Sequence, residues 1–159
     1  MPLDELYKDI ILDHYEYPRN KGRIERTACT CAGGDNPVCG DTVDVCVLLD
    51  NDHVEAVAFE GRGCAISQAS ASMMTEALEG KAIEEAQRWY QTVHGLLTNH
   101  PDEVDSDLEL GDLEALEGVR QYPVRIKCAL LAWEAFRVAL RQAVEGGKAA
   151  QQHAVITTE

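Results

Sequence analysis

The middle of the chain changes from helical to strand periodicity, and this change limits the possible folds more than any other feature. Residues 42–49 alternate in polarity and are rich in valine, and residues 54–60 repeat the alternation after the polar turn at 50–52. A period of two on both sides of a short turn predicts an antiparallel hairpin. The segments on either side have apolar residues at helical spacing, so we expect helices packed on an antiparallel sheet.

The remaining segments complete this architecture. We expect a helix over residues 3–14, a strand over 24–32, a turn over 33–37, helices over 67–78 and 83–94, and a last helix over 126–144. The last helix is the most regular, because Ile126, Leu130, Trp133, Leu140 and Val144 form one apolar stripe. The sequence therefore predicts an α+β fold: a small antiparallel three-stranded sheet packed with about four to five helices.

The length of 159 residues and the absence of internal repeats predict one domain. We place this domain at residues 1–147. An acidic stretch from Asp102 to Asp112 follows the break in the helical pattern and is predicted to be flexible, and the insertion is placed at residues 95–111. Residues 148–159 follow a pair of glycines and are predicted to form a disordered tail.

Charge and composition exclude several functions. The chain has 14 basic and 28 acidic residues, a net charge of −14, so binding to nucleic acid or to an anionic membrane is not expected. The first residues lack a signal-peptide pattern, and no segment approaches the roughly 18 apolar residues of a membrane span. We expect a cytoplasmic protein. In a reducing compartment, six cysteines indicate metal binding or thiol chemistry rather than a disulfide framework.

Three cysteines stand beside turn residues or predicted helix starts. Cys39 follows Pro37 and precedes Gly40, and the pattern Cys39-x-Asp41 presents a soft sulfur and a hard oxygen from one loop. Zinc accepts both donors, at distances of about 2.3 Å and 2.0–2.2 Å. A mixed set contains a ligand that can be displaced without unfolding the site, which suits a transfer function.

The other two cysteines are predicted near helix N-termini. Cys64 precedes the helix over 67–78, and Cys128 is expected in the first turn of the last helix, where backbone amides and the helix dipole stabilise a thiolate. Arg125 and Lys127 add positive charge beside Cys128, and Arg125 is the first candidate for an auxiliary role next to a thiolate.

Other candidates favour structural interpretations. Cys46 lies inside a valine-rich strand and is interpreted as a small buried apolar residue, and Cys29 and Cys31 are not expected to bind metal. Their individual roles stay open. His14 falls on the apolar side of the first helix and is interpreted as a core residue rather than a ligand.

Three motifs resemble those of a known family. They are Asn36-Pro37-Val38-Cys39-Gly40-Asp41, Gly61-Arg62-Gly63-Cys64-Ala65-Ile66-Ser67 and Ile126-Lys127-Cys128-Ala129-Leu130-Leu131-Ala132-Trp133. Together they resemble the iron–sulfur cluster assembly family that includes IscU and the N-terminal part of NifU, over roughly residues 3–145. Lys127 replaces the histidine of IscU-type scaffolds, Gln121-Tyr122-Pro123-Val124-Arg125 replaces their Leu-Pro-Pro-Val-Lys motif, and the insertion at 95–111 is similar to that of the SufU branch.

The resemblance to the SufU branch implies a zinc-dependent sulfurtransferase. Its implied zinc ligands are Cys39, Asp41, Cys64 and Cys128, and its catalytic residues are expected to be Cys39 and Arg125. In the SufU scheme a PLP-dependent cysteine desulfurase (SufS-like) docks, a histidine of that partner displaces Cys39 from zinc, and the freed thiolate accepts persulfide sulfur. A downstream cluster-assembly scaffold is the expected recipient.

Two alternatives stay open at this stage. The same four residues are suited to an iron ion or a labile [2Fe–2S] cluster, which would make the chain a scaffold that assembles a cluster for apo-proteins. The other alternative is a zinc-stabilised interaction module without transfer chemistry. The Asp41→Ala variant helps to separate them, because a stable brown cluster on that variant would favour the scaffold.

Overall fold

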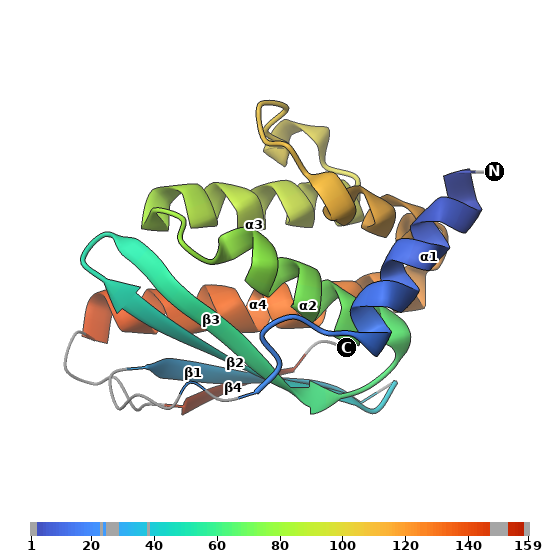
Figure 1. Cartoon of the computed structure of the whole chain (residues 1–159). Helices are drawn as coiled ribbons and strands as arrows, with labels where there is room; N and C mark the ends of the chain where they lie inside the picture. Colours follow the sequence, from blue (N-terminus) through green and yellow to red (C-terminus); the bar gives the residue numbers. More distant parts are fainter. Residues whose placement is uncertain (1–2, 23, 25–28, 38, 147–152, 158–159) are drawn as a thin grey trace.

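The computed structural model of the chain describes residues 3–22, 24, 29–37, 39–146 and 153–157. Four α-helices, two 3₁₀ helices and one sheet make up this part of the chain (Figure 1). In chain order the elements are α1 (Leu3–Glu16), β1 (Thr30–Asn36), β2 (Asp41–Asp50), β3 (His53–Arg62), α2 (Ala65–Leu78), α3 (Ile83–Thr98), η1 (Pro101–Glu103), η2 (Gly111–Gln121), α4 (Pro123–Gly146) and β4 (His153–Thr157).

The predicted antiparallel sheet is confirmed. β2 pairs antiparallel with both β1 and β3, and the hairpin predicted at residues 42–60 is the β2–β3 pair. The helices lie on one face of this sheet (Figure 1), and α4 packs along β1 and β2. Apolar side chains such as Val45 and Val47 point from the sheet into the core, where Trp133 and Phe136 of α4 are fully buried. Helices on one face of an antiparallel sheet give the predicted α+β class.

The position of β1 differs from the prediction. The sequence predicted a strand over 24–32 and a turn over 33–37, but residues 33–36 belong to β1, and residues 25–28 of the predicted strand lie outside the described part. The glycines serve close packing instead of a turn. A Cβ on Gly34 would stand 2.8 Å from Cδ1 of Leu131 on α4, so glycine allows the helix to approach the strand.

Pairing of β1 with β2 also corrects the interpretation of two cysteines. The register places Cys31 directly opposite Cys46, and the two residues form a disulfide with a Cα–Cα distance of 4.0 Å. Both are half-buried. The expectation that Cys46 is a free, buried apolar residue is therefore wrong, because a register that sequence alone does not give brings it next to Cys31.

The insertion predicted at residues 95–111 covers the end of α3 and the segment that follows it. α3 ends at Thr98, four residues beyond the prediction, and Asn99 closes it in the left-handed conformation with φ of 59°. The acidic stretch that follows packs against the fold: the Asp105 amide donates to Thr92 Oγ1 over 3.1 Å, and Leu113 and Leu116 of η2 are buried. At the other end of the chain, β4 pairs parallel with β1 as a fourth strand. The predicted disorder of residues 148–159 stays a prediction for the residues outside β4.

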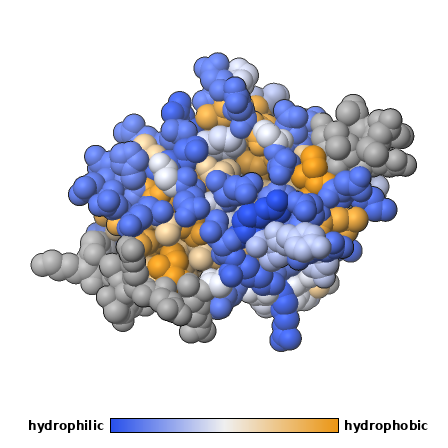
Figure 2. Space-filling view, viewed as in Figure 1, coloured by the Kyte–Doolittle hydropathy of each residue, from blue (hydrophilic) through white to orange (hydrophobic). Residues whose placement is uncertain are grey.

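The surface agrees with the acidic composition. Hydrophilic side chains cover most of the face in Figure 2, and smaller hydrophobic areas lie between them. Among the described helices, none combines the length and the apolar character that crossing a membrane requires.

Candidate metal and thiol site

Three separate segments bring sulfur atoms and a carboxylate together at one end of the sheet. The Cys128 thiol on α4 contacts Sγ of Cys39 at 3.3 Å, and Sγ of Cys64 lies 3.8 Å from Oδ2 of Asp41. The donor atoms of Cys39, Asp41 and Cys128 all lie within 4.8 Å of one another. Cys64 joins this group through its contact with Asp41. The four residues singled out in the sequence therefore lie in one cluster.

The turn between β1 and β2 positions Cys39 and Asp41. The backbone amides of Cys39 and Gly40 both donate to the carbonyl oxygen of Asn36, over 3.2 and 2.8 Å. Gly40 has a φ of +73°, a conformation that glycine adopts without strain. As a result Cys39 lies half-buried in the turn, and Asp41 begins β2 with no exposed surface.

Cys64 caps α2, as the sequence predicted. Its sulfur accepts a hydrogen bond from the Ser67 amide at 3.5 Å, and its own amide donates to Oδ1 of Asp41 at 2.9 Å. Gly63 makes this contact possible, because a Cβ there would collide with the Asp41 carboxylate and stand 2.6 Å from the Ser67 hydroxyl. The helix N-terminus thus fixes both the sulfur of Cys64 and the carboxylate of Asp41.

Cys128 differs from its prediction. α4 begins at Pro123, so Cys128 lies in the second turn, beyond the free backbone amides, and it is completely buried. Desolvation raises the pKa of the Cys128 thiol, and hydrogen bonds with Asp41 and Cys39 raise it further. The protein alone therefore favours the neutral thiol at this position, not the thiolate that the helix-dipole argument predicted.

Arg125 supplies positive charge at the edge of the cluster, as expected from sequence. Its pKa is raised above the usual value, first by a hydrogen bond with the Cys128 side chain and then by the charge of Cys64. Arg125 is an exposed residue. Arg125 can therefore meet both the sulfur atoms and an incoming molecule.

The donor set fits a zinc ion. Ligands around a tetrahedral zinc with bonds of about 2.0–2.3 Å lie about 3.5–3.8 Å apart, close to the 3.3 Å between Cys128 and Cys39 and the 3.8 Å between Cys64 and Asp41. Asp41 and Cys128 are both fully buried, and burying their anionic forms without a counter-charge is costly. A dication among them removes that cost, and thiolate and carboxylate ligands both suit zinc.

Two contributors escaped the sequence reasoning. Asn36 is buried, and its Nδ2 donates toward Sγ of Cys128 at 3.7 Å, which links the β1–β2 turn to α4. Gly63 is the other, through the close approach of Asp41. Both residues belong to the quoted motifs, but their contacts are with residues distant in sequence, so no local pattern reveals them.

An apolar groove of about 400 Å³ begins beside the cluster. α1 contributes Leu12, the start of α2 contributes Ile66, and the residues before Cys128 contribute Tyr122 and Arg125. Leu12 is 38% exposed and Tyr122 is 61% exposed, and Lys8 adds a second basic side chain. Large exposed apolar side chains with basic groups at the edge are typical of a protein-binding surface.

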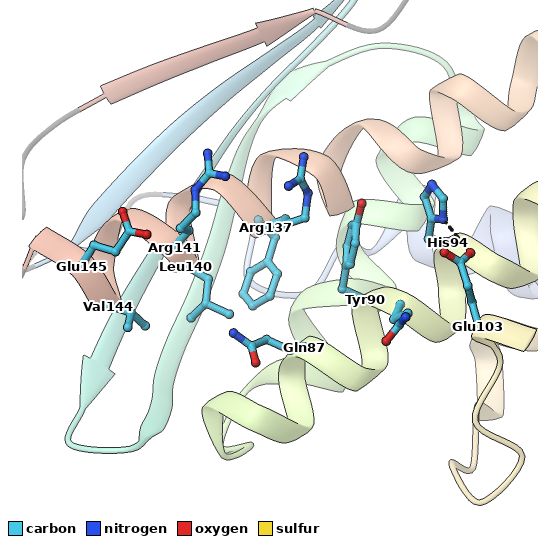
Figure 3. Close-up of a pocket in the computed structure, with 11 residues that line it drawn as sticks. Gln87, Tyr90, His94, Glu103, Arg137, Leu140, Arg141, Val144 and Glu145 are labelled. Atoms are coloured by element: carbon cyan, nitrogen blue, oxygen red, sulfur yellow. Dashed lines mark hydrogen bonds and ion pairs between the residues drawn. The ribbon is translucent and has the colours of Figure 1, made fainter.

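A second cavity, of about 530 Å³, lies between α3 and α4 and has no cysteine in its lining (Figure 3). Several polar groups at its wall contact one another. Tyr90 donates a 2.7 Å hydrogen bond to Glu134, the Arg137 guanidinium lies 5.7 Å from the Tyr90 ring, and His94 contacts Glu103 at 3.0 Å. Desolvation raises the pKa of Tyr90, and the bond to Glu134 adds to this shift. These pairs join α3 to its neighbours, and the thiol cluster remains the better candidate.

Comparison with known proteins identifies the family. The family model described as the NifU-like N terminal domain matches residues 6–142. The chain belongs to this family. The motif-based resemblance is thereby confirmed, and the match spans all four residues of the cluster.

Individual relatives divide between two descriptions. The chain is 45% identical over 145 residues to the zinc-dependent sulfurtransferase SufU of Bacillus subtilis (strain 168), covering 91% of this chain and 95% of that protein. It is 38% identical over 140 residues to the iron-sulfur cluster assembly scaffold protein IscU of Streptococcus pyogenes serotype M1, covering 88% and 86%. A crystal structure of a putative iron-sulfur cluster assembly scaffold protein for the SUF system from Fervidobacterium islandicum AW-1 matches with a TM-score of 0.77 and 35% identity, covering 87% of this chain and 99% of that chain.

Proposed function

We propose that this protein is a zinc-dependent sulfurtransferase of iron–sulfur cluster assembly that accepts persulfide sulfur on Cys39. The observation that carries the proposal is the convergence of three thiols and one buried carboxylate beside an exposed arginine. The 45% identity to a relative named zinc-dependent sulfurtransferase supports the same assignment.

The proposed zinc ligands are Cys39, Asp41, Cys64 and Cys128. When bound, the ion would keep its sulfur ligands deprotonated and protect them from oxidation. Asp41 is the ligand of different chemistry, and its carboxylate is held by the Cys64 amide at 2.9 Å. That bond would keep Asp41 in place while a neighbouring ligand is exchanged.

Cys39 is the acceptor that the geometry favours. Cys128 is completely buried, which leaves the two half-buried cysteines, Cys39 and Cys64. The sulfur of Cys64 is held at the start of α2 by the Ser67 amide, whereas Cys39 lies in a turn beside the exposed Gly40. A thiol that must reach a sulfur atom on another protein needs this accessibility.

The transfer itself is a thiol exchange without net oxidation. The Cys39 thiolate attacks the terminal sulfur of a cysteine persulfide on the donor, the donor's S–S bond breaks, and the donor cysteine leaves as a thiolate. Cys39 then carries the persulfide. The guanidinium of Arg125, beside Cys128 and Cys64, would stabilise the negative charge of the attacking and the newly formed sulfur anions.

The proposed donor is a PLP-dependent cysteine desulfurase of the SufS type, and the proposed recipient is a downstream cluster-assembly scaffold. The apolar groove lined by Leu12, Ile66 and Tyr122 is the proposed docking surface, because it continues directly from the cluster and would bring the donor to Cys39. A cytoplasmic location is proposed for the transfer chemistry, and it requires that the Cys31–Cys46 disulfide persists in reducing surroundings.

Mass spectrometry of sulfur on individual cysteine peptides tests the proposal. Zinc-loaded protein is incubated with a PLP-dependent cysteine desulfurase and cysteine, without reductant. We expect one added sulfur on the Cys39 peptide and none in the Cys39→Ser variant. Cys29→Ser, which removes a half-buried free cysteine elsewhere, should accept sulfur like the wild type.

A second arm, with ferrous iron, sulfide and reductant, tests the second candidate function. The scaffold role is favoured by the relatives named as IscU scaffolds and by a donor set that also suits iron. Absence of sulfur on every peptide, combined with a coloured cluster after addition of ferrous iron, sulfide and reductant, would reject the sulfurtransferase and favour the scaffold.

A further inference from the structure

A second group of potential metal ligands lies outside the thiol cluster, where three elements meet. His14 comes from α1, Glu76 from α2 and Asp112 from the start of η2, and one donor atom of each lies within 4.8 Å of the other two. Nε2 of His14 and Oδ2 of Asp112 are 2.9 Å apart. Adjacent ligands of a divalent ion with bonds of about 2.1 Å are about 3 Å apart, so this spacing suits a shared ion as well as a hydrogen bond.

The imidazole of His14 is fixed in the orientation that a ligand needs. His14 has no exposed surface, and its Nδ1 lies 2.8 Å from Oγ of the equally buried Ser72. The Arg19 amide donates to the same hydroxyl at 2.8 Å and holds it in position. Histidines that bind metals commonly use their second ring nitrogen in this way, which directs the free nitrogen toward the ion. Here Nε2 is directed at the carboxylates.

A hydrogen bond from His14 to Asp112 would join α1 to η2 without any ion, but it does not account for the space beside the carboxylates. A cavity of about 340 Å³ is lined by Glu76, Asp112 and Trp89 among others. Trp89 is 7% exposed, and its buried Nε1 has no hydrogen-bond partner in the described part of the chain. A buried donor without a partner calls for an acceptor, and water molecules bound to an ion in this cavity would supply one.

Charge and access favour a cation. Glu76 and Asp112 are 55% and 51% exposed, so an ion can reach them from solvent, and Glu109 adds a third carboxylate to the cavity lining. Arg19 is the nearest competitor, with its Nε 3.6 Å from Glu76. Its shorter contact, of 2.8 Å, is with Asp13, which can retain the guanidinium when Glu76 turns to an ion.

The structure assigns to His14, Glu76 and Asp112 a second metal site for a divalent first-row transition ion of the Mn²⁺ or Fe²⁺ class. One imidazole nitrogen and two carboxylate oxygens, without sulfur, suit these ions and distinguish the site from the thiolate cluster. The assignment does not depend on sulfur transfer, because none of these three residues belongs to the thiol cluster.

Titration with Mn²⁺ tests the assignment on the whole protein after the thiol cluster has been loaded with zinc. Free Mn²⁺ is counted by electron paramagnetic resonance. We expect one bound Mn²⁺ per chain and at least a tenfold weaker affinity in both Glu76→Gln and Asp112→Asn. Mutation of a residue that only hydrogen-bonds to a metal ligand typically weakens metal binding 10–100-fold, and loss of the ligand itself should cost no less. Asp112→Asn keeps an oxygen that can accept from His14, so the fold should survive.

Matched variants separate this site from diffuse attraction to an acidic surface. Glu79→Gln on the same side of the fold and Asp102→Asn in η1 remove equal charge from exposed positions and should leave Mn²⁺ affinity unchanged. Equal weakening in all four variants, or no Mn²⁺ bound to the wild type, overturns the assignment. If Asp112→Asn does not fold, the test of the assignment rests on two variants: Glu76→Gln, within α2, and Glu79→Gln, at the C-cap of α2.

Discussion

Two groups of cysteines occupy the two ends of the β1–β2 hairpin, and their surroundings give them different chemistry. Cys31 and Cys46 are opposed on paired strands and form a disulfide, with the free Cys29 two residues away. Cys39 and Cys128, from the turn and from α4, meet as free thiols. Four residue pairs lie between Cys31–Cys46 and Asn36–Asp41, and the five steps between them correspond to about 17 Å along the strands.

The comparison shows that the neighbours of a cysteine decide its role. Strand pairing brings Cys31 and Cys46 only to each other, so a covalent bond satisfies both. The functional cluster adds a buried carboxylate, a helix N-terminus and a guanidinium, contributed by Asp41, the start of α2 and Arg125. Three thiols around a carboxylate have more donor atoms than one disulfide can use, and this arrangement suits a metal.

The largest expected effect comes from removing the disulfide. In the double variant Cys31→Ser, Cys46→Ser, we expect the free energy of unfolding to fall by about 3 kcal/mol, because the closed loop spans 15 residues. Urea denaturation without reductant measures the loss. Reductant should lower the wild type to the same level and leave the double variant unchanged.

Zinc affinity and sulfur acceptance should not change in this double variant. If they do, the disulfide and the thiol cluster are coupled along the hairpin and do not act as independent groups. Equal stability of the variant and the wild type would show that the thiols are not bonded in solution.

Sequence reasoning found the regular elements and the four cluster residues because both depend on local signals. Alternation identified β2 and β3, apolar spacing identified α4, and glycine or proline neighbours marked Cys39 and Cys64. The disulfide was missed for two reasons: a reducing compartment was expected, and Gly33 and Gly34 looked like a turn, which placed β1 too early. With β1 displaced, the pairing of Cys31 with Cys46 was hidden.

The remaining errors concern contacts between distant segments. Burial of Cys128 under the β1–β2 turn raises the pKa of its thiol. The nearby helix start and two basic residues had predicted a lowered pKa. The group of His14, Glu76 and Asp112 joins three elements, and only tertiary structure brings these residues together. Local patterns thus identified residue types suited to chemistry, while packing decided their state.

The second-largest effect is expected at Gly63, which packs against Asp41 in the thiol cluster. In Gly63→Ala, the new methyl group would collide with the Asp41 carboxylate, and we expect a loss of about 2 kcal/mol in unfolding free energy, within the 1–3 kcal/mol typical of overpacking. Displacement of Asp41 should also weaken zinc binding, measured by competition with a chromophoric chelator.

Gly118→Ala is the matched control, because its Cβ would meet no atom within 4 Å. It should keep wild-type zinc affinity. Unchanged zinc affinity in Gly63→Ala would indicate that Asp41 is not a zinc ligand. The thiols would then bind zinc without a carboxylate.

The smallest effect is a pH dependence of the metal-free protein that, of the two cysteine groups, only the thiol cluster should show. Burial raises the pKa of Cys128 above its ordinary value of 9.0, so the neutral thiol contributes stability that is fully present below pH 9 and is lost as the pH rises through the folded-state pKa. One proton changes unfolding free energy by at most about 1.4 kcal/mol per pH unit. Urea denaturation between pH 8 and 10 measures this slope.

Cys128→Ala should lose this slope, whereas Cys29→Ala should keep it. Tyr90, whose pKa is also raised, contributes equally to all three proteins and cancels in the comparison. Zinc-loaded wild type should show a flatter profile, because a thiolate held by the metal has no proton left to release. A slope that is the same in Cys128→Ala and the wild type would mean that the buried thiol is not protonated in the metal-free fold. The contrast between the two cysteine groups would then rest on the carboxylate, the helix N-terminus and the guanidinium.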